Sequence, residues 1–154
     1  SLTGCHLILV NPGIHIGTKE AYAGVNPSPP KVKLEEVLAD RNRWKDELVN
    51  DFEASVFQNH PEIAKIKKQL YEAGAFYAAM SGSGSTVFGL FESKPKSFSI
   101  DKDYFILQKK MESLKKVQAD DLDFNNIGSW PAALKVIVCA VVFVVLRIKK
   151  PLVV

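Results

Sequence analysis

The sequence contains few of the residues that build disulfide frameworks and metal centres. It has 154 residues with only two cysteines, Cys5 and Cys139, which lie near opposite ends and form no CxxC pair. A disulfide framework and a zinc site are therefore not expected, and reduced thiols and a cytoplasmic location are favoured. The three histidines, His6, His15 and His60, have no second ligand at metal spacing, so no metal site is predicted.

An excess of one charge is also missing. The chain has 20 basic and 17 acidic residues and a net charge of +3. Because no basic stripe is interleaved with aromatic residues, nucleic acid is not an expected partner. The N-terminus shows no signal peptide. The chain starts at Ser1 and enters an apolar run almost at once, so we expect it to be a piece of a longer protein.

No apolar run reaches the length of about 20 residues that a membrane helix needs. The longest, residues 132–146, spans roughly fifteen residues and includes Lys135. Arg147, Lys149 and Lys150 follow it, like the basic flank on the cytoplasmic side of a membrane segment. Membrane association through residues 132–146 and a soluble apolar segment both remain open.

The sequence does contain enough apolar residues for one modest hydrophobic core, since 47% of its residues are hydrophobic. The run from His6 to Val10 predicts a buried strand ended by Asn-Pro-Gly. A short helix is expected next, with Thr18 as its N-cap and Gly24 at its end. A helical pattern starts at Lys33.

Further along, apolar residues recur at helical spacing. Trp44, Leu48, Phe52 and Val56 are each four residues apart, which predicts one helix across residues 44–56. The next helix should begin at Pro61 and end at Gly74. Short strands are predicted around residues 75–80, 86–91 and 104–107. This order of a strand, helices and further strands argues for an α+β fold, with helices layered on an antiparallel sheet.

Between two of these strands lies the stretch Ser81-Gly82-Ser83-Gly84-Ser85. The residues on both sides of this stretch are apolar and are expected to be buried, whereas a flexible linker has polar flanks. Its glycines permit positive φ, and consecutive N–H groups in such a turn can form an anion-binding concavity. The residues alone leave three interpretations open: contact with a phosphate, a tight structural turn, and a linker.

Residues 73–91, AGAFYAAMSGSGSTVFGLF, resemble the third signature motif of the GHMP kinases. Residues 7–22 and 48–63, LILVNPGIHIGTKEAY and LVNDFEASVFQNHPEI, resemble the C-terminal domain of the branch that phosphorylates 4-diphosphocytidyl-2-C-methyl-D-erythritol in non-mevalonate isoprenoid biosynthesis. The resemblance runs from about His6 to about Phe91 and implies a GHMP kinase C-terminal domain with a ferredoxin-like layer of helices on an antiparallel sheet. The domain is expected to cover residues 1–110.

The resemblance also implies roles for particular residues. The loop Ser81, Gly82, Ser83, Gly84 and Ser85 would lie near the phosphates of the bound molecules. Substrate binding is implied at Thr18 and Tyr22, with the Tyr22 ring packed on the cytosine of a cytidine diphosphate substrate; packing of Tyr22 in the core is the alternative. Asn50 and Asp51 match the Asn-Asp pair of the family, and we interpret them as structural.

The departures from the family matter as much as the match. The loop that cradles ATP in these kinases, and the lysine and aspartate that activate the substrate hydroxyl, belong to an N-terminal domain and have no counterpart in this sequence. No catalytic residue is therefore expected in this chain. The resemblance implies a parent kinase that uses ATP and Mg²⁺, with its N-terminal kinase domain as the partner of this chain, which alone should be inactive.

Residues 111–154 have a different character. Residues 111–146 resemble the N-terminus of PilO, the inner-membrane protein of type IV pili, so they suggest a junction between unrelated pieces. The tail could instead be the closing helix and strand of the kinase domain. Two further hypotheses for function stay open: a membrane-tethered pilus-assembly module defined by the tail, and a nucleotide-binding domain without catalysis.

Overall fold

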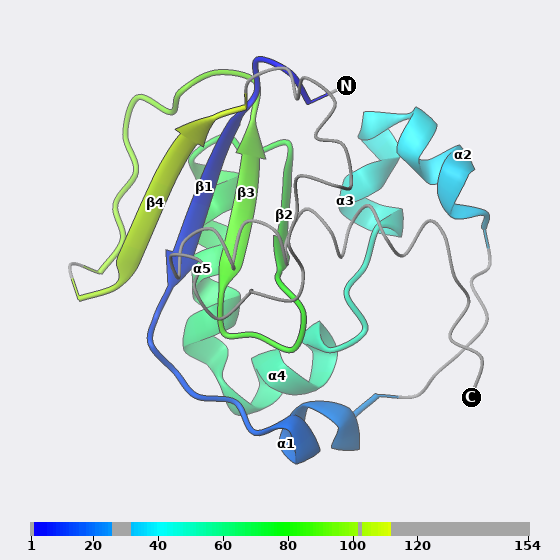
Figure 1. The fold of residues 1–154 in the computed structure, drawn as a ribbon, viewed down its shortest axis with the longest axis vertical. Coiled ribbons are helices and arrows are strands. Elements are labelled where there is room, and N and C mark those ends of the chain that lie inside the picture. Colours follow the sequence, from blue (N-terminus) through cyan, green and yellow to red (C-terminus); the bar gives the residue numbers. More distant parts are fainter. Residues whose placement is uncertain (1, 26–31, 102, 112–154) are drawn as a thin grey trace, which may run out of the picture.

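Four antiparallel strands form the sheet at the centre of the domain (Figure 1). The computed structural model describes residues 2–25, 32–101 and 103–111. The strands are β1 His6–Asn11, β2 Tyr77–Met80, β3 Val87–Phe91 and β4 Phe105–Lys110. Their order across the sheet is β2-β3-β1-β4, so β2 and β4 are the two edges. The α+β class and the antiparallel sheet predicted from the sequence are confirmed.

The helices lie mainly between β1 and β2 in the chain. They are α1 Thr18–Ala23, α2 Leu34–Ala39, the 3-10 turn Arg41–Arg43, α3 Trp44–Glu47, α4 Glu53–Asn59 and α5 Pro61–Glu72. Because β3 pairs with both β1 and β2, it separates the two strands that this helical segment joins. This is the split arrangement of ferredoxin-like sheets. No helix is assigned to the described part of the β3 to β4 connection.

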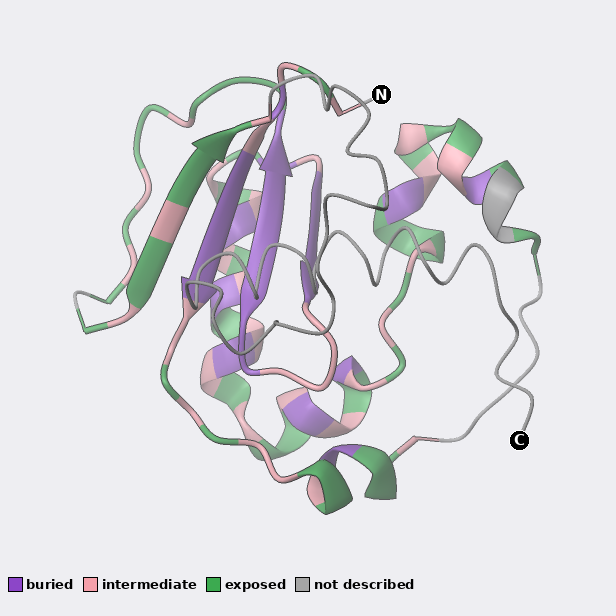
Figure 2. Ribbon diagram, in the orientation of Figure 1, coloured by how far each residue is buried: buried purple, intermediate pink, exposed green. Residues whose placement is uncertain are grey.

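Both faces of the sheet are buried by side chains that alternate along β1 (Figure 2). Ile8 and Val10 belong to a cluster with the apolar faces of α4 and α5, which lie behind the sheet in Figure 1. Leu7 and Leu9 belong to a second cluster on the opposite face, with Trp44 of α3. This period of two follows from strand geometry, in which successive side chains point to opposite faces.

The helix α5 begins and ends where local signals predict. Pro61 is its first residue, a position where the missing N–H of proline costs nothing. After the last turn Gly74 has φ +97°. Its N–H donates to Tyr71 O at 2.9 Å, and the Ala75 N–H donates to Leu70 O at 3.0 Å. These are the two bonds of a Schellman cap, so the predicted end at Gly74 is confirmed.

Two local predictions are wrong. Thr18 is the first residue of α1 and not its N-cap; Gly17 is the N-cap, and no side chain caps it. The single helix expected across residues 44–56 is interrupted between α3 and α4, with Leu48 at φ −94° and ψ 79°. The interruption lets Leu48 and Phe52 contact different clusters on the two faces of the sheet.

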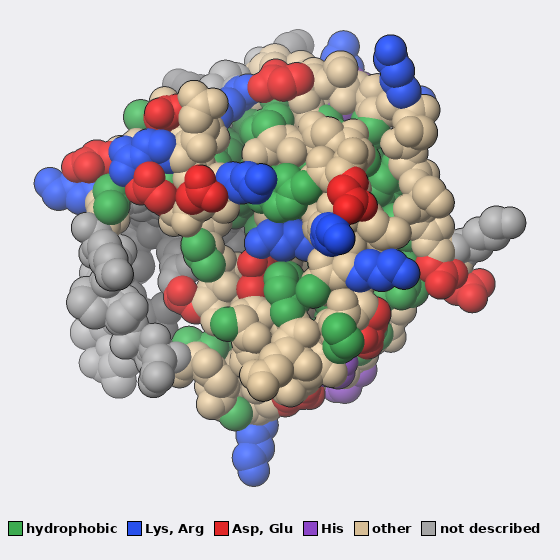
Figure 3. Space-filling view, turned by 180° about the vertical axis from the view of Figure 1, so that it is seen from behind, with side chains coloured by type: hydrophobic (Ala, Val, Ile, Leu, Met, Phe, Trp, Pro, Cys, Tyr) green, Lys and Arg blue, Asp and Glu red, His purple; other side chains and the backbone are tan. Residues whose placement is uncertain are grey.

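The outer surface carries charges of both signs. Viewed from behind, Lys and Arg side chains alternate with Asp and Glu side chains (Figure 3). Several form ion pairs, including Arg43 with Glu47 at 2.6 Å and Lys68 with Glu72 at 3.7 Å. Such exposed pairs contribute little to stability, so the fold depends chiefly on its two apolar clusters.

The C-terminal predictions fall largely outside what the structure describes. The membrane segment at residues 132–146, the PilO-like residues beyond Met111 and the apolar C-terminal segment all lie outside the described residues. Within the described ranges, no helix has both the length and the apolar character required to cross a bilayer. The predicted strand around residues 104–107 is confirmed as β4, which extends further, to Lys110.

Candidate functional site

The serine and glycine stretch is the loop of the β2–β3 hairpin. The Ser81 N–H donates to Thr86 O at 2.8 Å, and the Gly84 N–H donates to Ser81 O at 3.1 Å. Gly82 and Gly84 have φ of +58° and +95°, which glycine adopts without steric cost. The residues thus form a shaped turn between two paired strands, and the linker interpretation is wrong. We call residues 81–85 the glycine loop.

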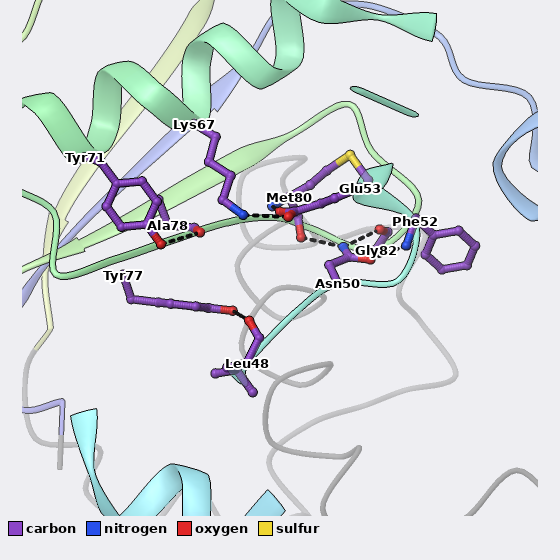
Figure 4. A network of polar contacts seen from close by, with 10 residues as sticks. All are labelled: Leu48, Asn50, Phe52, Glu53, Lys67, Tyr71, Tyr77, Ala78, Met80 and Gly82. Carbon is purple, nitrogen blue, oxygen red and sulfur yellow. Dashed lines mark hydrogen bonds and ion pairs between the residues drawn. The ribbon is translucent and has the colours of Figure 1, made fainter. Parts of the chain in front are cut away.

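Asn50, just before α4, holds the start of the glycine loop (Figure 4). Its Nδ2 donates to Met80 O and to Gly82 O, both at 2.8 Å. Its Oδ1 accepts the Phe52 N–H at 3.0 Å. These contacts with the backbone agree with the interpretation of Asn50 as structural. One side chain contacts both the loop and the segment that leads into α4.

Glu53 is a buried carboxylate at the first position of α4, with 6% of its surface exposed. Its Oε1 accepts the Met80 N–H at 2.7 Å, and its Oε2 pairs with Lys67 Nζ of α5 at 2.5 Å (Figure 4). Because a buried charge is tolerated only when it is paired and hydrogen-bonded, both contacts are needed. Glu53 and Asn50 together satisfy the N–H and the C=O of Met80.

Two tyrosine hydroxyls complete this network of polar contacts. Tyr71 of α5 donates to Ala78 O at 3.2 Å, and Tyr77 of β2 donates to Leu48 O at 2.9 Å. Burial raises the pKa of Tyr77 well above its ordinary value, and it also raises the pKa of Tyr71. The nearby Glu53 carboxylate adds to both pKa shifts, so both hydroxyls remain protonated donors at neutral pH.

Tyr22 lies on α1, at the same end of the sheet as the glycine loop (Figure 1). Its side chain is 62% exposed, so Tyr22 is not a core residue and that alternative is wrong. Its ring meets the Phe52 ring edge-on, with centroids 5.0 Å apart. Phe52 is also the residue whose N–H contacts Asn50. Thr18 is exposed at the start of α1.

Further contacts attach α1 and the chain before it to the rest of the domain. Glu20 Oε1 lies 2.8 Å from His60 Nε2, at the junction of α4 and α5. A Cβ on Gly24 would lie 2.2 Å from Ser55 Cβ, so only glycine allows α1 to approach α4 so closely. A Cβ on Gly84 would lie 2.6 Å from Ile16 Cδ1. The glycine loop therefore packs against the residues that lead into α1.

The molecule also has a hollow of about 640 Å³ that is separate from this region. It lies between the end of α5 and residues 92–99, and Glu72, Lys94 and Lys96 are among its lining residues. This is the end of β3 opposite the glycine loop, because β3 begins beside the loop and ends at Phe91. The hollow is not part of the candidate site.

The sequence contained a signal for Asn50 and Glu53 that we did not use. Asn followed three residues later by Glu is a spacing that marks the start of a helix, and it points to the interruption before α4. No signal in the sequence pointed to the two partners of Glu53. Its contact with Lys67 joins residues 14 apart, and its contact with Met80 joins residues 27 apart, so only the fold reveals them.

Residues 34–100, which include the glycine loop and its supports, match the family model described as GHMP kinases C terminal. This region is similar to the C-terminal domain of the GHMP kinases, the family that the sequence stretches resemble. The glycine loop, residues 81–85, lies within the matched region.

Curated relatives of this chain include two bacterial proteins named 4-diphosphocytidyl-2-C-methyl-D-erythritol kinase. The protein from Cytophaga hutchinsonii is 52% identical over 99 residues, covering 64% of this chain and 37% of the relative. The protein from Parabacteroides distasonis is 54% identical over 99 residues, covering 64% and 36%. The chain therefore spans little more than a third of the length of these relatives.

Solved structures similar to this chain include a crystal structure of 4-(cytidine 5'-diphospho)-2C-methyl-D-erythritol kinase. It has a TM-score of 0.48 and 27% identity, and the match covers 57% of this chain and 34% of that structure. A homoserine kinase from Cytophaga hutchinsonii has a TM-score of 0.44 and 20% identity, with coverages of 60% and 33%.

Proposed function

We propose that this chain is the C-terminal part of a kinase that phosphorylates a hydroxyl of 4-diphosphocytidyl-2-C-methyl-D-erythritol with ATP. The observation that supports this most is the identity of 52% and 54% to relatives that carry this activity in their names. The proposal assigns residues 1–110 to the C-terminal domain, names a separate N-terminal kinase domain as its partner, and places the parent enzyme in non-mevalonate isoprenoid biosynthesis in the cytoplasm.

In this proposal Tyr22 contacts the cytosine ring of the substrate. The support is its exposed position, since a ring that is 62% exposed has a face open to a ligand, and the Phe52 ring braces its edge. Stacking of a base on an aromatic ring contributes roughly 1–3 kcal/mol. Thr18, one turn earlier on α1, is the second proposed contact of the substrate.

The proposal places phosphate groups of the bound molecules against the glycine loop. Positive φ at Gly82 and Gly84 bends the backbone in the way that lets successive N–H groups face one anion. Ser81 and Ser83 add hydroxyl donors beside a half-buried backbone. The loop contributes position and charge stabilisation, which dominate phosphoryl transfer, and it needs no residue that reacts covalently.

The proposal assigns no metal ligand to this chain. Among the residues that the structure describes, no group of three or more His, Cys, Asp or Glu side chains is placed to hold an ion. In the proposal Mg²⁺, like the catalytic groups, belongs to the parent enzyme.

The test of the cytosine contact is a titration of CDP, followed by intrinsic Trp and Tyr fluorescence. We expect saturable binding, with affinity reduced about 5- to 150-fold in Tyr22→Ala, because stacking of about 1–3 kcal/mol is lost. Tyr22→Phe keeps the ring and is the matched control. Equal affinities of Tyr22→Ala and the unchanged chain would contradict the assignment of Tyr22.

The test of the activity is to mix this chain with the N-terminal domain of a relative and to measure ADP release with the methylerythritol substrate. ADP release that requires both parts would support the kinase. Binding of CDP without ADP release in the mixture would instead favour a domain that binds nucleotide without catalysis.

A further inference from the structure

Asn50 makes more contacts than the turn that precedes α4 requires. Such a turn uses only a side-chain acceptor for the N–H two residues on, and Asn, Asp and Ser can all supply one. In this chain the acceptor is Oδ1, which takes the Phe52 N–H at 3.0 Å. The amide nitrogen is not needed for that bond, yet it donates to Met80 O and Gly82 O, each at 2.8 Å. Only an amide supplies both the acceptor and the two donor hydrogens.

The two ends of this amide face two different parts of the proposed substrate site. Nδ2 contacts the glycine loop at Gly82, and Oδ1 contacts the backbone of Phe52. The Phe52 ring in turn supports the exposed ring of Tyr22, with centroids 5.0 Å apart. The loop and α1 are more than 50 residues apart in the sequence, and Asn50 lies between Gly82 of the loop and Phe52, the residue whose ring contacts Tyr22 (Figure 4).

We propose that Asn50 is a positioning residue that ties the glycine loop to the aromatic pair Phe52 and Tyr22, so that the proposed phosphate and cytosine contacts keep a fixed spacing. This inference rests on the proposed function for the identity of the two contacts. It adds a residue that touches neither ligand. Substrates that carry a base and a diphosphate at a set separation require such a spacing, because misplacement of either group weakens binding.

Single substitutions separate the two ends of the amide. Asn50→Asp keeps the acceptor for the Phe52 N–H and turns the donor into a carboxylate oxygen, which repels Met80 O and Gly82 O. Asn50→Ser also keeps an acceptor, loses the donor and adds no charge, so it repeats the test if the Asp variant does not fold. Asn50→Ala removes both ends. Asn42→Asp, at an exposed position, makes the same chemical change away from the site and is the matched control.

The primary measurement is amide hydrogen exchange of the 154-residue chain, followed residue by residue by NMR without ligand. In Asn50→Asp and Asn50→Ser we expect the Ser81 and Gly84 amides, which are bonded within the loop, to exchange at least about tenfold faster. The Phe52 amide should remain within about threefold. In Asn50→Ala all three amides should accelerate, and Asn42→Asp should change none of them.

Two exchange results would overturn the inference. One is unchanged exchange of Ser81 and Gly84 in both Asn50→Asp and Asn50→Ser. The other is an equal acceleration at Ile8 in the centre of β1, since this would show a general loss of stability and no local effect on the loop.

A CDP titration of the same variants separates this inference from the proposed function. If the unchanged chain binds CDP, we expect affinity to fall about tenfold in Asn50→Asp and to stay the same in Asn42→Asp; equal affinity in both variants would overturn the inference. If the unchanged chain does not bind CDP, the proposed cytosine contact fails, and the exchange pattern alone decides whether Asn50 positions the loop.

Discussion

The two edge strands of the sheet, β2 and β4, differ in how their outward-facing backbone groups are covered. On β2, side chains from the helical segment occupy the outward-facing backbone groups. Tyr71 donates to Ala78 O, Glu53 accepts the Met80 N–H and Asn50 donates to Met80 O. Every residue of β2 is buried. This edge is closed to other strands by the protein's own side chains.

The opposite edge, β4, is open in the described structure. None of its six residues is buried, and Phe105 and Ile106 are 57% and 37% exposed. Its pairing with β1 covers all six residues, so its other side is left facing outward. It ends in Lys109 and Lys110, and lysine on an edge strand discourages pairing with another chain.

The difference shows where this domain places its polar contacts. The glycine loop continues directly from the closed edge, and the last residue of β2, Met80, is bound through both its N–H and its C=O. Rigid attachment at that point fixes where the loop starts. The open edge carries no loop of the proposed site, and its last two residues are lysines.

The largest effect is expected from Glu53→Ala. It leaves the Met80 N–H without its acceptor and Lys67 without its ion partner in a buried region. We expect the free energy of unfolding, measured in urea, to fall by about 2 to 4 kcal/mol. Glu92→Ala is the control, because Glu92 pairs with Arg41 at the exposed surface. Similar losses in the two variants would remove the distinction between a closed edge and ordinary surface.

A smaller effect, and one that depends on pH, is expected from Tyr77→Phe. At neutral pH the loss of the hydrogen bond to Leu48 O should lower the free energy of unfolding by about 1 kcal/mol. The pKa of Tyr77 is raised by burial, so its contribution is complete below the unfolded pKa of about 10 and is lost as pH rises above it.

The pH dependence follows from proton binding. Above about pH 10 the unfolded chain releases the Tyr77 proton while the folded chain retains it, so the unfolding free energy falls by about 1.4 kcal/mol per pH unit for this group. Tyr77→Phe should remove the part of this pH-dependent fall that Tyr77 causes. The fall is measured as the difference in the free energy of unfolding in urea between pH 8 and pH 11. Tyr104→Phe beside β4 is the control for loss of a hydroxyl. Identical losses of stability between pH 8 and pH 11 in Tyr77→Phe and the unchanged chain would count against this account.

The smallest effect is expected on the open edge. Phe105→Thr exchanges one strand-compatible residue for another at a side chain that is 57% exposed, so the free energy of unfolding should change by less than about 0.5 kcal/mol. Phe88→Thr, at a buried position of β3, is the contrasting substitution and should cost several times more. A loss above about 2 kcal/mol at Phe105 would mean that β4 is covered by something in solution.

Local sequence signals predicted several elements correctly because their causes are local. Pro61 and Gly74 bound α5 through backbone geometry that proline and glycine impose wherever they stand. The run from His6 to Val10 forms most of β1, since a short apolar stretch ended by a turn is typical of a buried strand.

The prediction of a single helix across residues 44–56 failed because the periodic apolar residues pack against two different faces of the sheet. Trp44, Leu48, Phe52 and Val56 share a helical spacing, but Trp44 and Leu48 pack on one face of the sheet, and Phe52 and Val56 pack on the other. A straight helix cannot reach both faces. Periodicity reports that residues are buried, and it does not report which neighbours bury them.

The amino-acid sequence alone determined the α+β class, the bounds of α5, the hairpin that carries the glycine loop and the family resemblance, because each depends on residues close together in the chain. Only the tertiary structure decided that Asn50 and Glu53 bind the end of β2 and that Tyr22 lies exposed against Phe52. Those contacts join residues 27 to 32 positions apart, or separate helices, and their geometry exists only after the helices have packed on the sheet.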